Sequence, residues 1–219
     1  MNDLLAFEKS LYKKGISLIA GTDEVGRGPL VGPVVAAAVI LPKNYKMTGI
    51  NDSKKLSETK REEYYDIIMK DAISVGIGIV HAETIDEINI LEASRLAMKI
   101  SVDNLKVKPE YLLIDGNKGI ETDIPSQTII KGDAKSISIA AASIIAKVTR
   151  DSMMYELDEK HPEYGFNQHK GYPTKKHVEN IVKFGLLDCY RFTFKPINVL
   201  IKKGGPFEGK IRNKNFKKL

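Results

Sequence analysis

The sequence lacks the features of secreted and membrane proteins. It contains one cysteine, Cys189, in 219 residues, which excludes an internal disulfide and a cysteine-rich zinc cluster and favours the reducing cytoplasm. The longest apolar run covers residues 34–41, far fewer than the ~18 residues that cross a bilayer. The N-terminus also lacks the basic flank and apolar stretch of a secretion signal. We therefore expect a water-soluble, cytoplasmic protein that makes no membrane contact.

Charge of one sign is only slightly in excess. Lys and Arg number 34 against 28 Asp and Glu, a formal net charge of +6, which favours polyanionic partners without identifying one. Residues 202–219 hold seven Lys or Arg and one acid, Glu208. This segment is typical of a flexible basic tail that either contacts phosphates or only keeps the terminus soluble. Since the chain shows no linker or internal repeat, residues 1–201 are expected to form one domain.

Segments rich in Val and Ile predict strands, and they alternate with helical patterns. The predicted strands are residues 17–23, 34–41, 73–80, 111–115 and 128–131. Helices are expected after the capping residues Ser57, Thr84 and Thr174. A long helix is expected over residues 136–159, ending where a proline follows. This order predicts an α/β fold in which the helices after position 136 form a lobe against the sheet.

Acidic residues stand where the predicted strands end. Asp23 and Glu24 end the first strand, Asp115 ends the fourth, and Asp133 follows the fifth. Strand ends are where α/β sheets usually assemble sites, and carboxylates gathered there raise one another's pKa unless a cation lies among them. Oxygen ligands without Cys or His select a hard ion, so the expected cofactor is Mg²⁺ or Mn²⁺. Each acid taken singly also fits an exposed turn or a helix cap, and spacing alone leaves their convergence open.

Glycines surround the first acid pair. Adjacent residues on a regular strand point to opposite faces, so Asp23 and Glu24 reach one ion only where the strand bends. Gly21 and Gly26 would allow a bend or bulge, and Gly26 and Gly28 leave the backbone open to a ligand. The glycine spacing does not fit a dinucleotide-binding fingerprint, and acids stand where a pyrophosphate would approach, which excludes a Rossmann site.

Six motifs, in order along the chain from about Leu18 to Ile197, resemble those of ribonuclease HII. They are Asp23-Glu24-Val25-Gly26-Arg27-Gly28-Pro29, Asn51-Asp52-Ser53-Lys54-Lys55-Leu56, Leu113-Ile114-Asp115-Gly116, Lys131-Gly132-Asp133, Ala146-Lys147-Val148-Thr149-Arg150-Asp151 and His169-Lys170-Gly171-Tyr172-Pro173-Thr174. The resemblance implies a ribonuclease H-like mixed β-sheet flanked by helices, with a helical C-terminal lobe, in one catalytic domain over residues 1–201. The arginine of the first motif distinguishes the chain from ribonuclease HIII.

The resemblance also implies which residues form the site. The catalytic, metal-binding acids would be Asp23, Glu24, Asp115 and Asp133. The substrate-binding residues would be Gly26, Arg27, Gly28, Ser53, Lys54, Lys55 and Tyr172. The glycine–arginine–glycine backbone would contact the ribose 2′-hydroxyl, which distinguishes RNA from DNA. The tyrosine would pack on the following deoxyribose, and the serine and two lysines would hold phosphates.

Two features near the C-terminus have no role in this assignment. His161, His169 and His177 recur at intervals of eight, which fits no local metal-ligand spacing, and we interpret them as surface or packing residues. Residues 190–194 differ from relatives, in which this segment usually begins with His and has Ser before the Phe. The acids lie elsewhere, so this difference affects only the expected local packing.

The sequence therefore predicts an endonuclease that hydrolyses the RNA strand of RNA–DNA hybrids. It is expected to cut 5′ of ribonucleotides embedded in duplex DNA, leaving 3′-hydroxyl and 5′-phosphate ends, by metal-ion catalysis. Its partners would be the hybrid and ribonucleotide-containing duplex DNA, and the protein would be a monomer. Two alternatives stay open: an integrase- or resolvase-like nuclease that acts on DNA alone, and a non-catalytic nucleic-acid-binding module with structural acids.

Overall fold

The computed structural model describes residues 3–46, 56–202 and 204–209. Their strands form a sheet in the order β3-β2-β1-β4-β5. The strands are β1 Ile19–Val25, β2 Val34–Ile40, β3 Ser74–Val80, β4 Tyr111–Asp115 and β5 Ser126–Ile129. β2 pairs antiparallel with β1 and β3, whereas β4 pairs parallel with β1 and β5. The predicted mixed sheet is confirmed, although β5 begins and ends two residues earlier than the predicted range 128–131.

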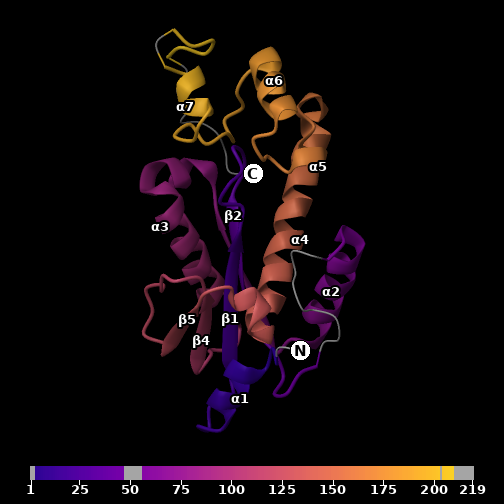
Figure 1. Ribbon diagram of the computed structural model, residues 1–219, viewed down its shortest axis with the longest axis vertical. Coiled ribbons are helices and arrows are strands. Elements are labelled where there is room, and N and C mark those ends of the chain that lie inside the picture. Colours follow the sequence, from indigo (N-terminus) through magenta and orange to yellow (C-terminus); the bar gives the residue numbers. More distant parts are fainter. Residues whose placement is uncertain (1–2, 47–55, 203, 210–219) are drawn as a thin grey trace.

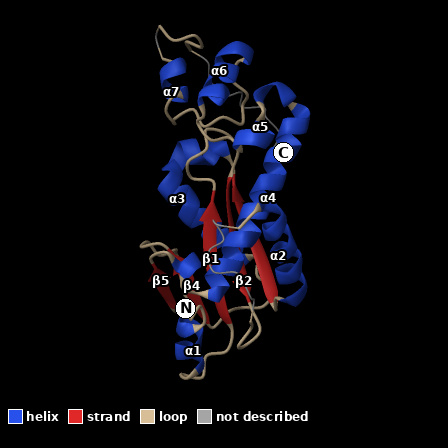
Figure 2. Cartoon of the chain, turned by 45° about the vertical axis from the view of Figure 1, so that its right-hand side comes forward, coloured by secondary structure: helices blue, strands red, loops and turns tan. Residues whose placement is uncertain are grey.

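Helices cover both faces of this sheet, with α3 on one face and α4 and α2 on the other (Figure 1). Their bounds are α1 Ala6–Tyr12, α2 Glu58–Asp71, α3 Ala82–Asp103, α4 Ile137–Lys160, α5 Phe166–His169, α6 Lys175–Phe184 and α7 Ile197–Leu200, with the 3-10 turns η2 Gly132–Ala134 and η3 Pro162–Tyr164. The distal end of α4 extends beyond the sheet towards the end of the molecule that carries α5, α6 and α7 (Figure 2). We call this part, residues 150–201, the helical lobe. The predicted helical lobe is present, but the first part of α4 packs against the sheet, so the lobe begins later than position 136.

Strand β2 lies at the centre of the core because all of its residues are apolar and fully buried. Ala36 and Ala38 pack into the cluster that contains α3 residues, whereas Ala37 and Val39 pack into the cluster that contains α4 residues. Successive residues of a strand face opposite sides of the sheet, and the small alanines let both helices approach closely. A continuous apolar run is thus the signature of a strand covered on both faces.

Gly21 marks the closest approach of α4 to the sheet. A Cβ atom at this position would lie 2.2 Å from the carbonyl carbon of Ser138 in the first turn of α4. β1 stays in one-to-one register with both neighbours here, since Gly21 pairs with Val39 and with Leu113. The predicted bend at Gly21 is therefore wrong, and the glycine is needed for helix–sheet contact. Gly26, with φ of 98°, does turn the chain out of β1.

Helix starts predicted from capping residues are mostly confirmed. The hydroxyls of Ser57, Ser136 and Thr174 accept hydrogen bonds from the third residue of α2, α4 and α6, respectively. Each bond satisfies one amide that the helix itself leaves unpaired. α4 ends at Lys160, before Pro162, as predicted.

The predicted cap at Thr84 is wrong. α3 begins at Ala82, and its interior contains a non-helical residue, Asn89, with φ of 68° and ψ of 166°. The Asn89 side chain accepts hydrogen bonds from the amides of Leu91 and Glu92. The cap that starts the long regular part of this helix is therefore an asparagine after a kink, a geometry that asparagine tolerates better than threonine.

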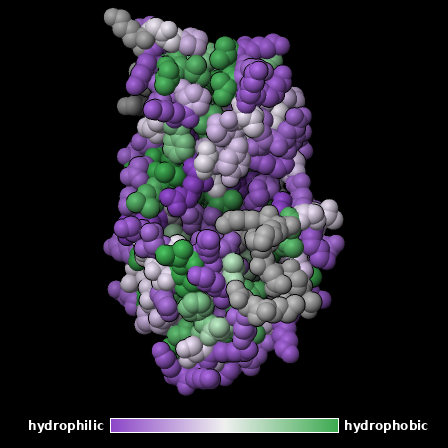
Figure 3. Space-filling model, viewed as in Figure 1, coloured by the Kyte–Doolittle hydropathy of each residue, from purple (hydrophilic) through white to green (hydrophobic). Residues whose placement is uncertain are grey.

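The helical lobe has its own apolar cluster. Its buried members are Leu30, Val31, Met154, Leu157, Tyr164, Phe166, Ile181, Leu186, Tyr190 and Ile197. Leu30 and Val31 come from the segment after β1, so the lobe packs directly onto the chain that leaves the sheet. Figure 3 shows a mostly hydrophilic face with several separate hydrophobic patches, one of them at the end that carries α6 and α7. Within the described ranges, no helix is both long enough and apolar enough to span a membrane.

Candidate active site

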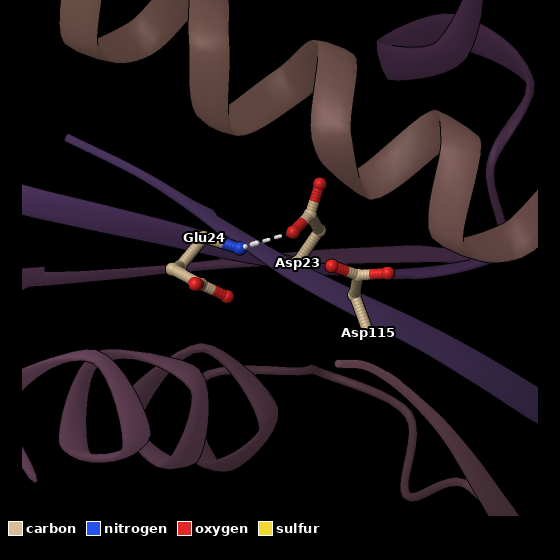
Figure 4. Close-up of side chains that lie close together, drawn as sticks. All are labelled: Asp23, Glu24 and Asp115. Atoms are coloured by element: carbon tan, nitrogen blue, oxygen red, sulfur yellow. Dashed lines mark hydrogen bonds between the residues drawn. The ribbon is translucent and has the colours of Figure 1, made fainter. Parts of the chain in front are cut away.

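Three carboxylates meet at the ends of two neighbouring strands. Asp23 and Glu24 belong to β1 and Asp115 ends β4. One oxygen from each lies within 4.8 Å of the others, and Figure 4 shows the three side chains around the ends of the strands. Asp23 is buried, whereas Glu24 and Asp115 are partly exposed. The convergence that spacing left open is therefore present for three of the four predicted acids.

Adjacent residues of β1 reach this cluster without a bulge. The register with β2 is unbroken from Ala20 to Val25, so Asp23 faces the α4 side and Glu24 the α3 side. Pairing with β4 ends at Thr22, which leaves the edge of β1 open beyond it. The longer side chain of Glu24 comes round this open edge to Asp115. Glu24 therefore reaches Asp115 because β4 stops pairing with β1, and β1 needs no bend.

The carboxylates raise one another's proton affinity. Burial raises the pKa of Asp23 well above its usual range, and the charges of Glu24 and Asp115 raise it further. Hydrogen bonds from the Ser143 hydroxyl and the Glu24 amide only partly oppose this effect. Burial also raises the pKa of Glu24, with Arg27 acting in the opposite direction. A divalent cation among these oxygens would remove the repulsion, so the donor set fits a hard metal ion.

Asp133 lies beside the cluster and is not one of its three members. It is buried in the turn η2, which precedes α4. The preceding residue, Gly132, donates its amide to the Asp115 carboxylate at 2.6 Å. A Cβ at Gly132 would lie 2.6 Å from Ile139 Cδ1 and 3.1 Å from that same carboxylate oxygen. The turn that carries Asp133 therefore fixes the orientation of Asp115.

A cleft of about 450 Å³ contains the cluster. It is lined by Asp23, Glu24, Val25, Gly26, Arg27, Gly28, Arg61, Asp115, Ser143, Lys147 and Tyr172. The predicted glycine–arginine–glycine segment and Tyr172 thus share one cavity with the acids. Ser53, Lys54 and Lys55 lie outside the described residues.

Sequence reasoning did not assign Arg61, Ser143 or Lys147 to the site. Lys147 and Ser143 are one turn apart on α4, so a helical spacing from a motif lysine could have identified the serine. Arg61 is in α2, and no local pattern distinguishes it from the other charged residues of that helix. Lys147 pairs with Asp151 at 2.7 Å, which holds its ammonium near the cleft.

The ring of Tyr172 lies over the glycine segment. A Cβ at Gly28 would meet Tyr172 Cε1 at 3.2 Å, and the tyrosine side of the cleft is open, with Tyr172 42% exposed. Its backbone is fixed, because its amide donates to the His169 carbonyl and its carbonyl lies 2.9 Å from His177 Nδ1. The side chain is exposed, while the backbone that carries it is held in place.

The histidines of the lobe pack as the sequence predicted. His177 is fully buried and stacks on His169 with ring centroids 4.0 Å apart, and His161 is more exposed. His177 Nε2 lies 2.8 Å from the Tyr190 hydroxyl. Residues 190–194, whose packing the sequence left open, are thereby tied to the segment that carries Tyr172.

Comparison with known proteins agrees with this site. The sequence model of the family Ribonuclease HII matches residues 20–197. The chain belongs to the ribonuclease HII family. A Ribonuclease HII of Bacillus cereus is 59% identical over 201 residues, which are 92% of this chain and 78% of that protein.

Solved structures of the family share the fold. The ribonuclease H2 of Pyrococcus horikoshii OT3 aligns with a TM-score of 0.70 at 26% identity, over 83% of this chain and 95% of that one. The RNase HII in the PCNA complex from Archaeoglobus fulgidus aligns with a TM-score of 0.68 at 29% identity, over 81% of this chain and 95% of that one. These structures place the mixed sheet and its flanking helices in the ribonuclease H-like fold.

Membership of the ribonuclease HII family defines the reaction class. The protein is an endoribonuclease, a hydrolase that acts on the RNA of RNA–DNA hybrids, as predicted. It depends on a divalent metal, in keeping with the acidic cluster of Asp23, Glu24 and Asp115. The DNA-only nuclease and the non-catalytic binding module are therefore excluded as descriptions of this chain.

Proposed function

We propose that this ribonuclease HII removes ribonucleotides from duplex DNA by cutting on their 5′ side, leaving 3′-hydroxyl and 5′-phosphate ends. The observation that carries the proposal is one shared cavity. The acidic cluster, the backbone of residues 26–28 and the Tyr172 ring line the same cleft. A phosphate bound at the acids therefore places the adjoining sugar beside the glycine segment and the tyrosine.

Asp23, Glu24 and Asp115 are proposed to hold the catalytic metal, as Mg²⁺ or Mn²⁺, with Asp133 as the fourth acid. Their oxygen donors suit a small hard ion. When bound, such ions activate water and stabilise the leaving oxygen of a phosphodiester. Gly132 orients Asp115 through its amide at 2.6 Å, and Ser143 orients Asp23. The role of Asp133 comes from the family motif, and its position one residue after Gly132 supports it.

Cationic side chains are proposed to position the nucleic acid. Arg61 and Lys147 line the cleft from α2 and α4, where they can contact phosphates on either side of the scissile bond. Arg27 lies 3.3 Å from Glu24 and is half exposed, so it reaches both the acids and the solvent side of the cleft. Ser53, Lys54 and Lys55 are proposed to add phosphate contacts.

Selection of a ribonucleotide is proposed to use backbone groups and an aromatic face. Gly28 has no side chain and lies beside the Tyr172 ring, so a 2′-hydroxyl can approach its backbone closely, whereas the space beside Gly26 is filled by Arg150. The exposed Tyr172 ring offers a flat apolar surface for the next deoxyribose. A 2′-hydroxyl on that next sugar would weaken this contact, which favours a junction between RNA and DNA.

A cleavage assay tests the proposal. The substrate is a duplex with one ribonucleotide, compared with an all-DNA duplex of the same sequence and with an RNA–DNA hybrid. We expect cutting 5′ of the ribonucleotide in Mg²⁺ or Mn²⁺, none in EDTA, and none of the all-DNA duplex. Cleavage of the hybrid with an intact single-ribonucleotide duplex would overturn the proposed excision role. The protein is further proposed to act as a cytoplasmic monomer, which sedimentation at working concentration checks.

A further inference from the structure

Two arginines of the helical lobe are completely buried. Arg150 on α4 and Arg191 after α6 have no solvent exposure. Among the described residues neither forms an ion pair with a carboxylate; both donate to backbone carbonyls. Burial of an unpaired cation is unfavourable unless its donors are satisfied. Here the donors of both arginines are satisfied by the carbonyls that they hold.

Arg191 binds the carbonyls of the glycine–arginine–glycine segment. Its Nη2 donates to the carbonyl of Gly26 at 2.6 Å and its Nη1 to the carbonyl of Arg27 at 3.2 Å. Its Nε and Nη2 also donate to the carbonyl of Gly32, at 3.1 and 3.0 Å. The planar guanidinium thus ties both ends of the turn between β1 and β2 to one point.

The orientation of these carbonyls fixes the orientation of the next amides. In a trans peptide the C=O and the following N–H point in opposite directions. Because the carbonyls of Gly26 and Arg27 point to the buried guanidinium, the amides of Arg27 and Gly28 point away from it. Both residues line the cleft, and neither amide donates to another residue within the described ranges. Two amide donors without a partner among the described residues are therefore directed away from the buried guanidinium, in residues that line the cleft.

We propose that Arg191 is a positioning residue that aims the amides of Arg27 and Gly28 at the sugar of the substrate ribonucleotide. This inference rests on the proposed function, in which that segment contacts the 2′-hydroxyl. Arg191 does not touch the substrate; it acts through the peptide planes that it holds. The ligand for these donors is an oxygen of the ribose that follows the metal-bound phosphate.

Arg191 is itself held firmly. Its amide donates to the Leu30 carbonyl at 2.8 Å, and the Asp86 carboxylate of α3 accepts hydrogen bonds from the amides of Phe192 and Thr193. Burial, reinforced by the charge of Arg150, lowers the pKa of the Arg191 guanidinium to about 9, so it keeps its proton and all its donors at neutral pH. The carbonyls of Gly26 and Arg27 are therefore held from the lobe side, and the amides of Arg27 and Gly28 stay available to a ligand.

The test uses Arg191→Lys, which keeps a cation but cannot satisfy three carbonyls in one plane. Asn180→Ala is the matched control, since it removes another buried lobe side chain, one that donates to the Tyr164 carbonyl and does not touch the segment. For each protein the affinity for a single-ribonucleotide duplex is divided by that for an all-DNA duplex, measured with Ca²⁺ in place of Mg²⁺. Cleavage rates in Mg²⁺, Mn²⁺ affinity by calorimetry and the amide spectrum of ¹⁵N-labelled protein complete the set.

We expect Arg191→Lys to lower the affinity ratio at least tenfold and kcat on the single-ribonucleotide duplex by about a hundredfold, because small misplacements in a site have such effects. Mn²⁺ affinity should stay within about twofold of the wild type. The Arg27 and Gly28 amide resonances should shift with the ribonucleotide duplex in the wild type and in Asn180→Ala but not in Arg191→Lys.

Other outcomes separate the two hypotheses. A wild type that binds and cuts both duplexes alike overturns the proposed function. A selective wild type together with an equally selective Arg191→Lys overturns only the role of Arg191, as does a loss that Asn180→Ala reproduces. Should Arg191→Lys fail to fold, the same affinity ratio is measured on Asp86→Asn. This change weakens the hydrogen bonds from the amides of Phe192 and Thr193 that hold the backbone next to Arg191. An unchanged ratio there overturns the role, and a lowered one supports it.

Discussion

Buried charge occurs at both ends of the cleft, and it is treated in opposite ways. At the sheet end, Asp23, Glu24 and Asp115 lie together, and the pKa of Asp23 rises through burial and through its acidic neighbours. Arg27 pairs with Glu24, and Arg61 and Lys147 line the same cleft, but repulsion among the acids remains. At the lobe end, Arg150 and Arg191 are completely buried, and backbone carbonyls accept hydrogen bonds from them. The acids keep a mutual repulsion, whereas the buried arginines are satisfied internally.

The difference indicates what each end is built for. Carboxylates that repel one another are stabilised only by a group from outside, so their arrangement depends on a cation that can come and go. Guanidiniums bonded to carbonyls need nothing from outside, so the segment they hold keeps its shape in the metal-free protein. The cleft thus combines a metal site that needs a bound cation with a sugar-binding segment that is already ordered. Substitutions in either part test this contrast.

Asp115→Asn should give the largest effect. The amide keeps the shape of the side chain and can still accept from Gly132, but it loses the charge that holds the ion. We expect cleavage to fall about a thousandfold or more, since several kcal/mol of transition-state stabilisation come from the metal, while duplex binding stays within a few fold. In EDTA the variant should be more stable than the wild type, by about 1 kcal/mol, because a repulsive charge is gone.

Thermal unfolding in EDTA and a cleavage time course check this prediction. Asp123→Asn, at a position between β4 and β5, is the control for loss of an acid as such. Substantial residual cleavage by Asp115→Asn would remove Asp115 from the metal site, and a lower stability would mean that its charge is already compensated in the apo protein.

Tyr172→Ala should give the next largest effect, at the preformed end. We expect a loss of about a hundredfold on the single-ribonucleotide duplex, because the scissile phosphate is no longer placed accurately. The loss on an RNA–DNA hybrid should be smaller, since there the next sugar carries a 2′-hydroxyl that already weakens the ring contact. Single-turnover rates on both substrates measure this, with Tyr172→Phe as the control that keeps the ring. Equal losses on both would make Tyr172 a structural residue only.

Acidification should lower the stability of the helical lobe by protonating His177. The Tyr172 carbonyl can only accept, so Nδ1 of His177 carries the proton and Nε2 accepts from the Tyr190 hydroxyl. Burial, aided by the charge of His169, lowers the pKa of His177 to about 4. A histidine whose folded pKa lies below its unfolded value of about 6.5 stabilises the protein above that value. The stabilisation is lost as the pH falls from about 6.5 to about 4.

The magnitude follows from the width of this window. A depression of this size corresponds to about 3 kcal/mol between pH 7 and pH 4. Urea unfolding of the wild type and of His177→Phe at these two values measures it, with His161→Gln as a control on the lobe surface. The difference in unfolding free energy between wild type and His177→Phe should shrink by this amount on acidification, and a constant difference would contradict the assignment.

Removal of residues 210–219, the last part of the predicted basic tail, should have the smallest effect. The chain up to Gly209 packs on the lobe, since Phe207 joins its apolar cluster and the Gly209 amide donates to Ile201. Truncation after Gly209 therefore spares this contact. We expect duplex affinity to fall a few fold and the slope of log affinity against log salt to become shallower by about 1 to 3. A variant with neutral Gln at the basic positions of residues 210–219 should behave alike, and an unchanged slope would make the tail a solubilising terminus.

The sequence predicts the elements well wherever their cause is local. Alternation and apolar runs identify the strands, and Ser57 and Thr174 cap their helices as expected because a cap acts over three residues. The cap predicted at Thr84 fails because α3 begins at Ala82 and is interrupted at Asn89, which the local pattern does not indicate. Acids at the ends of apolar strands identify most of the metal cluster without any knowledge of the fold.

Contacts distant along the chain are what the sequence does not reveal. Arg191 meets Gly26 across 165 positions, and its partners are carbonyls that every residue possesses, so no residue type marks the pairing. Glu24 reaches Asp115 because β4 stops pairing with β1 at Thr22, which depends on the extent of a neighbouring strand. The family motifs include Glu24 but not Arg191, and only the structure shows which atoms the arginine holds.

Helix α4 gives the cleft a fixed length. Ser143 on this helix bonds Asp23, and Lys147 lines the cleft one turn later. Arg150 follows, donating to the carbonyls of Val31 and Pro33 and packing against Gly26. Seven residues of α-helix span roughly 10 Å, and one inserted residue would turn the later groups by about 100°. The backbone contact at Gly21 prevents the helix from sliding along the sheet. The distance between the acidic cluster and the proposed sugar-binding segment is therefore set by a single helix.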